Sequence, residues 1–554
     1  MRQTTLSVIL EINPASVGIL SNRIEQLKKL EETPPRGQTK LYANLTKGVP
    51  SLHFMSMSVF EGADYDPLFV IEVNFDGSPG PFWAQLEALH GACLREMLRC
   101  CKRPGDKSGP LYDAVTAPHS RYPIAPYLEA RTVYPSVFHN GNRGLARDRI
   151  AQESELFIET RAMLAKAALS APDPYRGKDA VHIHKLLRAA VVGKFGWLNQ
   201  RPPARIPPGE RVLDFLYLAL FIYAVVFALS IPGIALSQIA TTRRFLLGLA
   251  ILLLIAGFLL YRMRDPLPGK AAYTRRGGLT PASLSSDKSI SPGSVIGFVF
   301  WIGVFVASYL LLATLLAGLA AVALTENTYG TVLVPTFRVV CLGLAGAILC
   351  GFAVVVWLRA LERRDSSHDA PAVNEKMMRE MTRREDRIAQ NHMGSVVLVK
   401  PGVLRMALFR TGHVGLHLLL RVVATTGYLG SMRTVHFAHW AFVNNGSRLL
   451  FFSNFDHSWD SYLDDFIEKA HGGLTLAWGS GTGFPATRFL VLDGASHGRQ
   501  FKTWARHSMA VSRFWFSAYK NLTVDQIERQ ARIADGLRKK RLTLKEAEIW
   551  ASDL

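Results

Sequence analysis

The chain carries two versions of one segment, one near each end. The residues at 7–14, SVILEINP, reappear at 395–401 as SVVLVKP, and LFVIEVNFD at 68–76 is echoed by LLFFSNFD at 449–456. The order is kept, and the offset between matching residues drifts only from 388 to 380, as short insertions and deletions would produce. We therefore expect two copies of one domain, which can form within one chain the pair that single copies form as dimers.

Four long apolar runs separate the two copies. They are Leu213–Leu236, Phe245–Tyr261, Val295–Leu324 and Thr331–Trp357. Each run is long enough to cross the roughly 30 Å hydrocarbon core of a bilayer as a helix. They account for the high hydrophobic content of 49%. We expect four transmembrane helices in two hairpins, with the lipid bilayer as a partner.

Small residues predict how these helices pack. The third and fourth runs carry them at four-residue spacing, at Ala313, Ala317 and Ala321 and at Gly343, Ala347 and Gly351. Small side chains let two helices approach closely, so we expect these two helices to pair. The fourth run also contains Arg338, and an ionisable group inside a span is by default a functional hypothesis.

The distribution of lysine and arginine predicts the orientation in the membrane. Positive residues gather before the first run, between the second and third, and after the fourth, at Lys194, Arg201, Arg205, Arg211, Arg262, Arg264, Lys270, Arg275, Arg276, Lys288, Arg359, Arg363 and Arg364. The opposite side carries only Arg243 and Arg244. Because positive loops stay inside, we expect both terminal copies in the cytoplasm, with the chain in a bacterial inner membrane. The N-terminus reads as a strand rather than a signal peptide.

The net charge of +20 raises the question of nucleic acid binding. No helix-turn-helix, zinc-finger or RNP pattern accompanies the charge, and much of it lies where a polytopic protein needs topology signals. We therefore expect no nucleic acid partner. The five cysteines have no metal-binding or redox spacing, which favours free thiols and predicts no metal site.

Periodicity predicts the same order of elements in each copy. The first copy gives strands at 5–12, 52–60, 68–75 and 133–139, with helices at 14–30, 82–101 and 145–167. The second gives strands at 395–399, 434–443, 448–455 and 513–519, with helices at 403–423, 459–470 and 523–539. This order is βαββαβ with a trailing helix, the ferredoxin-like arrangement. We expect an α+β protein with two such domains forming an intrachain pseudo-dimer, separated by four transmembrane helices.

The expected parts of the chain are five: the first copy at 1–170, a basic juxtamembrane linker at 171–211, the membrane helices at 212–360, a charged helical linker at 361–393 and the second copy at 394–554. Within the first linker, the amphipathic stretch Ala180–Trp197 predicts an interfacial membrane anchor. Leu416–Leu420 is apolar enough to suggest a fifth span, but Arg410 and Arg421 leave it too short.

At the level of topology the chain resembles the dimeric α+β barrel superfamily, in which two ferredoxin-like sheets face each other. The segments Phe75-Asp76-Gly77 and Phe455-Asp456-His457 loosely resemble the Asp-Gly signature of the dye-decolorising peroxidases in that superfamily. The resemblance implies a haem cofactor and a peroxidase-like oxidoreductase activity. It identifies no residue as the haem ligand.

A histidine and an aspartate recur at matching places in the two hairpins. Antiparallel pairing sets His436 opposite Asp456, and the first copy places His53 and Asp76 likewise. A carboxylate beside an imidazole fixes its tautomer, which suits a general base, an oriented ligand of a metal or haem, or a buried structural pair. These four residues are the candidate catalytic groups, and the purely structural alternative stays open.

Strand alternation predicts the surroundings of these pairs. It sets Trp440 on the face of His436, with Asn454 from the neighbouring strand, and it sets His439 on the opposite face. Asn74 is the counterpart of Asn454 in the first copy. Trp440, Asn454 and Asn74 are therefore the candidate cofactor-binding residues of an aromatic-lined pocket.

Three functions remain open from the sequence. The first is a membrane-anchored oxidoreductase or ligand-binding protein that acts on an apolar or membrane-derived small molecule. The second is a non-enzymatic membrane protein that binds a partner or ligand, with the histidines and aspartates purely structural. The third is a small transporter that uses Arg338.

Overall fold

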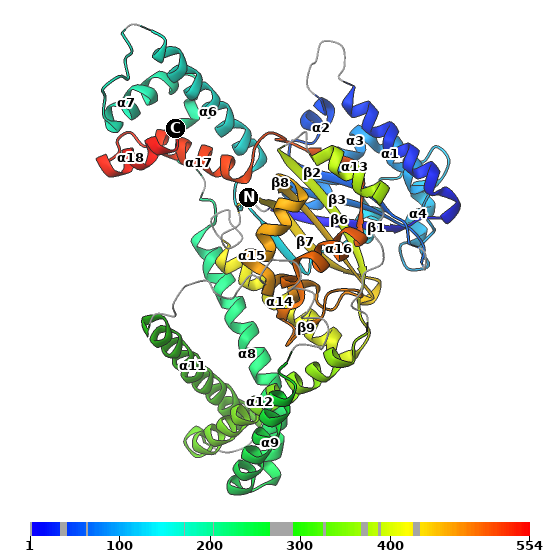
Figure 1. Cartoon of the computed structure of the whole chain (residues 1–554), viewed down its shortest axis with the longest axis vertical. Coiled ribbons are helices and arrows are strands. Elements are labelled where there is room, and N and C mark those ends of the chain that lie inside the picture. The colour runs from blue at the N-terminus through cyan, green and yellow to red at the C-terminus, as the bar shows by residue number, and fades with distance from the viewer. Residues whose placement is uncertain are drawn as a thin grey trace.

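The structure is a computed structural model that describes residues 3–33, 41–62, 65–170, 172–202, 204–265, 292–324, 328–366, 375–385, 389–424 and 433–554. It is an α+β protein with two antiparallel five-stranded sheets and four long apolar helices (Figure 1). The predicted basic residues Lys270, Arg275, Arg276 and Lys288, and part of the linker at 361–393, lie outside the described residues.

The first sheet has the strand order β12-β2-β3-β1-β4. Its strands are β1 (Gln3–Glu11), β2 (Leu52–Phe60), β3 (Leu68–Asp76), β4 (Thr132–Val133) and β12 (Ser512–Ser517). The second sheet has the order β11-β6-β8-β7-β5. Its strands are β5 (Val137–Asn140), β6 (Gln390–Leu398), β7 (Val435–Val443), β8 (Arg448–Asp456) and β11 (Met509–Ala510).

Each sheet takes one edge strand from the other half of the chain. β4 pairs with β1 in its own half, but the chain then continues into β5, which pairs with β7 in the second sheet. Likewise β11 pairs with β6, and β12 crosses to β2 in the first sheet. The prediction that 133–139 and 513–519 close their own units is therefore wrong for most of both segments. Between β4 and β5 stands Pro135, which has no N–H to extend a ladder.

The two sheets face each other, and helices cover their outer faces. Against the first sheet pack α1 (Val17–Glu32) and α3 (Pro79–Leu98), with the short α2 (Ala43–Gly48), α4 (Gly109–Thr116) and α5 (Ala125–Ala130) beside them. Against the second pack α14 (Val403–Val423), α15 (Trp459–Trp478) and α16 (Gly498–Ser508), with the two-residue strands β9 (Thr487–Arg488) and β10 (Leu492–Asp493) nearby. Between the sheets an apolar cluster includes Ile9, Val70, Val396 and Phe452.

The trailing helices of the two halves form a separate helical bundle, seen at the upper left of Figure 1. Its members are α6 (Arg147–Ala168), α7 (Ala180–Val191), the short helix η2 (Gly196–Asn199), α17 (Val524–Arg538) and α18 (Leu544–Ser552). Leu187 and Val191 of α7 are buried in its core with Leu537 and Trp550. The predicted interfacial anchor is therefore wrong, because the apolar face of this stretch packs on protein rather than lipid.

Four helices are long and apolar enough to span a membrane: α8 (Pro208–Ile239), α9 (Thr242–Arg262), α11 (Pro292–Leu324) and α12 (Tyr329–Arg364). The closest approach joins α8 to α12, where a Cβ on Gly346 would lie 2.5 Å from the Cα of Gly233. Gly343 faces Ile234 of α8 in the same way. The glycine face of α12 thus packs on α8, while α12 also contacts α11, the helix that it was predicted to pair with. The Pro232-Gly233 step in α8 supplies the smooth surface that this crossing needs.

Buried charges join the sheets to the membrane helices. Asp214 near the start of α8 accepts from Arg143, which follows β5, at 2.6 Å, and from Arg421 of α14 at 2.6 Å. At the end of α12, Glu362 accepts the backbone N–H groups of Phe489 and Leu490 at 3.0 and 2.9 Å. Buried paired charges hold their partners in fixed geometry. The second sheet is therefore fixed to both α8 and α12.

Candidate functional site

The predicted contacts between histidine and aspartate are present in both halves. His53 Nε2 lies 3.1 Å from Asp76 Oδ2, and His436 Nε2 lies 2.8 Å from Asp456 Oδ1. Both histidine side chains are fully buried, as is Asp456. The two pairs occupy matching ends of β2 and β3 and of β7 and β8.

Each aspartate also holds the start of a trailing helix. Asp76 Oδ2 accepts the backbone N–H of Arg147, the first residue of α6, at 2.8 Å. Asp456 Oδ2 accepts the N–H of Val524, the first residue of α17, also at 2.8 Å. A carboxylate at a helix N-terminus satisfies an otherwise unpaired donor and interacts favourably with the helix dipole. The pairs therefore connect each hairpin to its trailing helix, which is the geometry that the structural alternative requires.

A β-bulge changes which residues share the face of His436. The register between β7 and β8 shifts between Val435 and Phe437, and the same shift occurs between Leu52 and Phe54 in the first half. One extra residue reverses the alternation beyond it. Trp440 therefore packs among the helices on the outer face, against Trp478, and the prediction that it lines the site is wrong. His439, predicted on the opposite face, points between the sheets and contacts Ser7 Oγ at 2.9 Å.

The histidines of these pairs do not suit the haem that the resemblance implied. Both ring nitrogens of His53 are engaged, Nε2 by Asp76 and Nδ1 by the hydroxyl of Tyr519 at 2.8 Å. His436 Nε2 faces Asp456 and also the side-chain amide of Gln390 at 3.2 Å. Aromatic rings cover the imidazoles, Phe437 against His53 and Phe54 against His436. An iron ligand at His53 would have to break these contacts, whereas the buried Nδ1 of His436 has no hydrogen-bond partner among the described residues but lies in a ring covered by Phe54, so we derive no haem chemistry from either position. Nor do the described residues contain a cluster of three or more metal-ligating side chains.

A second polar cluster, centred on Glu72, lies between the two sheets. Its carboxylate is fully buried and accepts from Ser56 at 3.1 Å and from Asn454 at 3.3 Å. Asn74 also donates to it, and His392 Nε2 lies 3.6 Å away. Both predicted asparagines thus contact Glu72 rather than a pocket around the histidine–aspartate pairs.

Burial and neighbouring groups determine which titratable side chains between the sheets are charged. Burial alone would raise the pKa of Glu72, but the hydrogen bond and charge of His392, with His439 and Asn74, lower it below its usual 4.5. Burial lowers the pKa of His439 to about 4, and it lowers the pKa of His139 on β5 to about 4 as well. The interior therefore contains one carboxylate and at least two neutral imidazoles near pH 7. It can hold protons and hydrogen bonds, and it rigidifies the pairing of the sheets.

These buried imidazoles predict a loss of stability in acid. The unfolded chain takes up a proton at His139 below about pH 6.5, whereas the folded chain does so only near pH 4, so folding stability falls as pH drops across this interval. His139→Leu is expected to make the fall in melting temperature between pH 6.5 and 4 shallower. His507→Leu, at an exposed position, is the control. Equal pH slopes for His139→Leu and the unmodified chain would contradict the prediction.

The two halves differ at the centre of this cluster. When the two halves are aligned on Asp76 and Asp456, Phe452 occupies the position of Glu72, and His392 occupies the position of Thr5. The histidine–aspartate pair recurs in both halves and connects each hairpin to its trailing helix. The carboxylate of Glu72 has no counterpart at the matching position of the second half, which is Phe452. Glu72 and His392 were not predicted as site residues from the sequence. The signal was present in β3, where Glu72 shares the alternation of Asn74 and Asp76 in an otherwise apolar strand.

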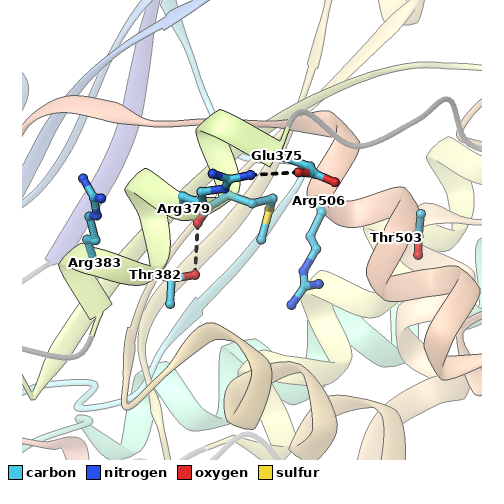
Figure 2. A pocket seen from close by; sticks show the side chains of 7 residues that line it. Glu375, Arg379, Thr382, Arg383, Thr503 and Arg506 are labelled. Carbon is cyan, nitrogen blue, oxygen red and sulfur yellow. Dashed lines mark hydrogen bonds and ion pairs between the residues drawn. The ribbon is translucent and has the colours of Figure 1, made fainter.

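An open groove lies outside the sheets, between α13 (Glu375–Glu385) and α16 (Figure 2). Its volume is about 680 Å³. Its lining residues are Glu375, Met378, Arg379, Thr382, Arg383, Thr503 and Arg506. α13 falls in the segment that was predicted as a charged helical linker with no role in binding. The spacing of Arg379 and Arg383, one helical turn apart, was the available signal for the groove.

The arginines of the groove differ in their pairing. Arg379 contacts Glu375 at 3.1 Å, and Arg506 makes two contacts with Asp460 at 2.8 and 2.7 Å while its guanidinium lies over Trp459. Arg383 is exposed and has no hydrogen-bond or ion-pair partner among the residues that the structure describes. The groove thus presents an excess of positive charge with one uncommitted guanidinium.

Comparison with known proteins adds no assignment: no family model matches the chain, and neither a curated protein nor a solved structure matches it significantly. The class that the fold defines is an α+β protein with two antiparallel five-stranded sheets and four candidate membrane helices, two of which contact the second half of the chain.

Proposed function

We propose that the chain is a membrane-anchored ligand-binding protein that takes a water-soluble anion in the groove between α13 and α16. The observation that carries the proposal is the uncommitted Arg383 beside two further arginines in a groove of about 680 Å³. Small-molecule sites commonly have volumes of roughly 300–1,000 Å³ and a few convergent polar groups. In Figure 1, α13 lies at the end of the molecule away from α9, α11 and α12, which favours a ligand from water over a lipid.

The lining chemistry narrows the class of ligand. Guanidinium groups bind carboxylate and phosphate oxygens with paired, charge-assisted hydrogen bonds. Thr382 and Thr503 add hydroxyls, and Met378 adds an apolar surface. A small molecule with one or more carboxylate or phosphate groups fits this lining better than the apolar molecule expected from the sequence.

The proposal also includes the finer architecture. The two halves are proposed to be ferredoxin-like units that form an intrachain pseudo-dimer of the dimeric α+β barrel kind, which the strand orders β4-β1-β3-β2 and β11-β6-β8-β7 support. We also propose that both termini lie in the cytoplasm, which the distribution of lysine and arginine supports, and that the membrane is a bacterial inner membrane. The groove would then open to the cytoplasm.

The other functions expected from the sequence stay predictions. The oxidoreductase and the non-enzymatic partner- or ligand-binding protein stay predictions. The contacts of His53 and His436 identify no haem ligand for the oxidoreductase. Arg338 is exposed and donates to Thr242 at the start of α9, so its side chain has a local structural partner. A transporter that uses Arg338 also stays a prediction.

Arg383→Gln is expected to weaken anion binding at least tenfold, since a charged hydrogen bond contributes about 1.5–3 kcal/mol. The measurement is titration calorimetry of the purified chain in nanodiscs with citrate and with inorganic pyrophosphate. Because Arg383 is exposed and has no partner among the described residues, the folded state should keep its melting temperature.

Arg541→Gln serves as the matched control, because it removes one exposed arginine outside the groove. Binding of neither probe, or equal affinities for Arg383→Gln and Arg541→Gln, would overturn the proposal.

A further inference from the structure

The outer side of helix α14 is apolar apart from Thr411, with Arg410 and Arg421 on one flank. Its inner side packs on the second sheet, where Phe409 and His413 are buried. The residues on the opposite side, at helical spacing, are Leu404, Ala407, Leu408, Thr411, Val414, Leu418 and Val422. Val414 has 46% of its surface exposed in the isolated chain, as does Leu419 at the edge of this face. A helix on the surface of a soluble domain carries polar residues on its outer side, so this face requires a cover.

Contacts with α8 show where this face lies. Arg421 pairs with Asp214 at 2.6 Å, and a Cβ on Gly415 would touch the ring of Phe221 at 3.0 Å. The two contacts on α8 are seven residues apart, or roughly 10 Å along the helix. α14 therefore lies against the first part of α8, beside Asp214 and Phe221.

The length of α9 places the bilayer boundary on α8. α9 has 21 residues, roughly 30 Å, which is about the thickness of the hydrocarbon core. It follows α8 after Ala240 and Thr241 only, so both helices reach the far boundary together. About 20 residues back from Ile239 along α8 give the near boundary, close to Phe221. Gly415 of α14 lies at this same level.

We propose that α14 is an interfacial helix whose outer face, defined by the seven residues from Leu404 to Val422 given above, is immersed in the headgroup and acyl boundary of the bilayer that α8 crosses. The occupant of this face is lipid, because the face is apolar and continuous with the contact on a membrane helix at the boundary level. The same helix contributes Phe409 to the core of the second sheet, so the sheet is seated directly on the membrane surface.

The test measures contact with lipid at Val414. A fluorescent amino acid is introduced there by amber suppression, which leaves the native cysteines untouched, and the full chain is placed in nanodiscs containing nitroxide-labelled phosphatidylcholine. Leu220 of α8, 63% exposed, is the lipid-facing reference, and Ile549 of α18, 59% exposed, is the reference in water.

The expected result is a loss of fluorescence at Val414 comparable to that at Leu220, stronger for nitroxides near the headgroup than for those near the chain end, with none at Ile549. Quenching at Val414 as weak as at Ile549 would overturn the proposal and indicate that a protein partner or water covers the face. If the label at Val414 prevents folding, the same label at Leu419 gives the same two outcomes.

Discussion

Asp456→Ala is expected to lower the stability of the folded chain by about 2–6 kcal/mol. The substitution leaves two buried donors without an acceptor, the ring of His436 and the N–H of Val524, and each such loss costs about 1–3 kcal/mol. The bundle should loosen as well, because Val524 is the first residue of α17. The measurement is the melting temperature of the purified chain by tryptophan fluorescence, with helix content by circular dichroism.

Asp464→Ala is the control, because the Asp464 side chain is 62% exposed and its ion pair with Lys502 of α16 is open to solvent on the Asp464 side. Its stability should stay within about 0.5 kcal/mol of the unmodified chain. Asp456→Asn should lie between the two, since an amide oxygen can still accept one of the hydrogen bonds. Citrate affinity should be the same in all variants that fold. A stable Asp456→Ala protein with impaired ligand binding would contradict the structural role. It would indicate that His436 and Asp456 take part in binding the ligand.

Gly346→Leu is expected to prevent assembly of the membrane helices. Even a Cβ on Gly346 would lie 2.5 Å from the Cα of Gly233, and backbone on that side cannot move aside as a flexible side chain can. The larger side chain would force α12 away from α8, with loss of the close contacts that hold membrane helices together. The measurement is the yield of monodisperse protein after extraction in mild detergent, which should fall to a small fraction of that of the unmodified chain.

Gly351→Leu gives a matched control on the same helix, because a Cβ there meets nothing within 4 Å. It adds the same apolar volume to α12 without a collision. Equal yields for Gly346→Leu and Gly351→Leu would show that α8 and α12 do not cross at Gly233 and Gly346 in the membrane.

Much of the fold could be predicted from the sequence, because it depends on periodicities. The four apolar helices, the two hairpins and the α+β class follow from apolar run lengths and alternation. The exchange of β5 and β12 could not be predicted, since residues such as Phe138 and Phe514 alternate equally well in either sheet. β-Propensity determines whether a segment forms a strand. Which strand it pairs with depends on packing over the whole chain.

The candidate site was predicted in part for a related reason. The contact of His436 with Asp456 follows from antiparallel pairing, and it is present. Trp440 was placed on the wrong face because one bulge residue reverses every later position on the strand, and a bulge leaves no mark in the sequence of VHFAHW. The close crossing of α12 with α8 was missed because the small residues of α12 were matched only with those of α11, whereas Gly233 of α8 is where the two backbones meet.

The exchange of edge strands has a consequence for how the chain is made. The strands β1, β2 and β3 of the first sheet leave the ribosome long before β12, which covers the edge of β2 and is more than 450 residues later in the sequence. Until β12 is synthesised, one edge of β2 is unpaired, although all nine residues of β2 are buried in the complete fold. An unpaired strand edge can pair with other chains and so promotes aggregation. All four apolar helices are synthesised in the interval. Early insertion of α8 would hold the incomplete half at the membrane, at a distance from its neighbours, until the last strand arrives.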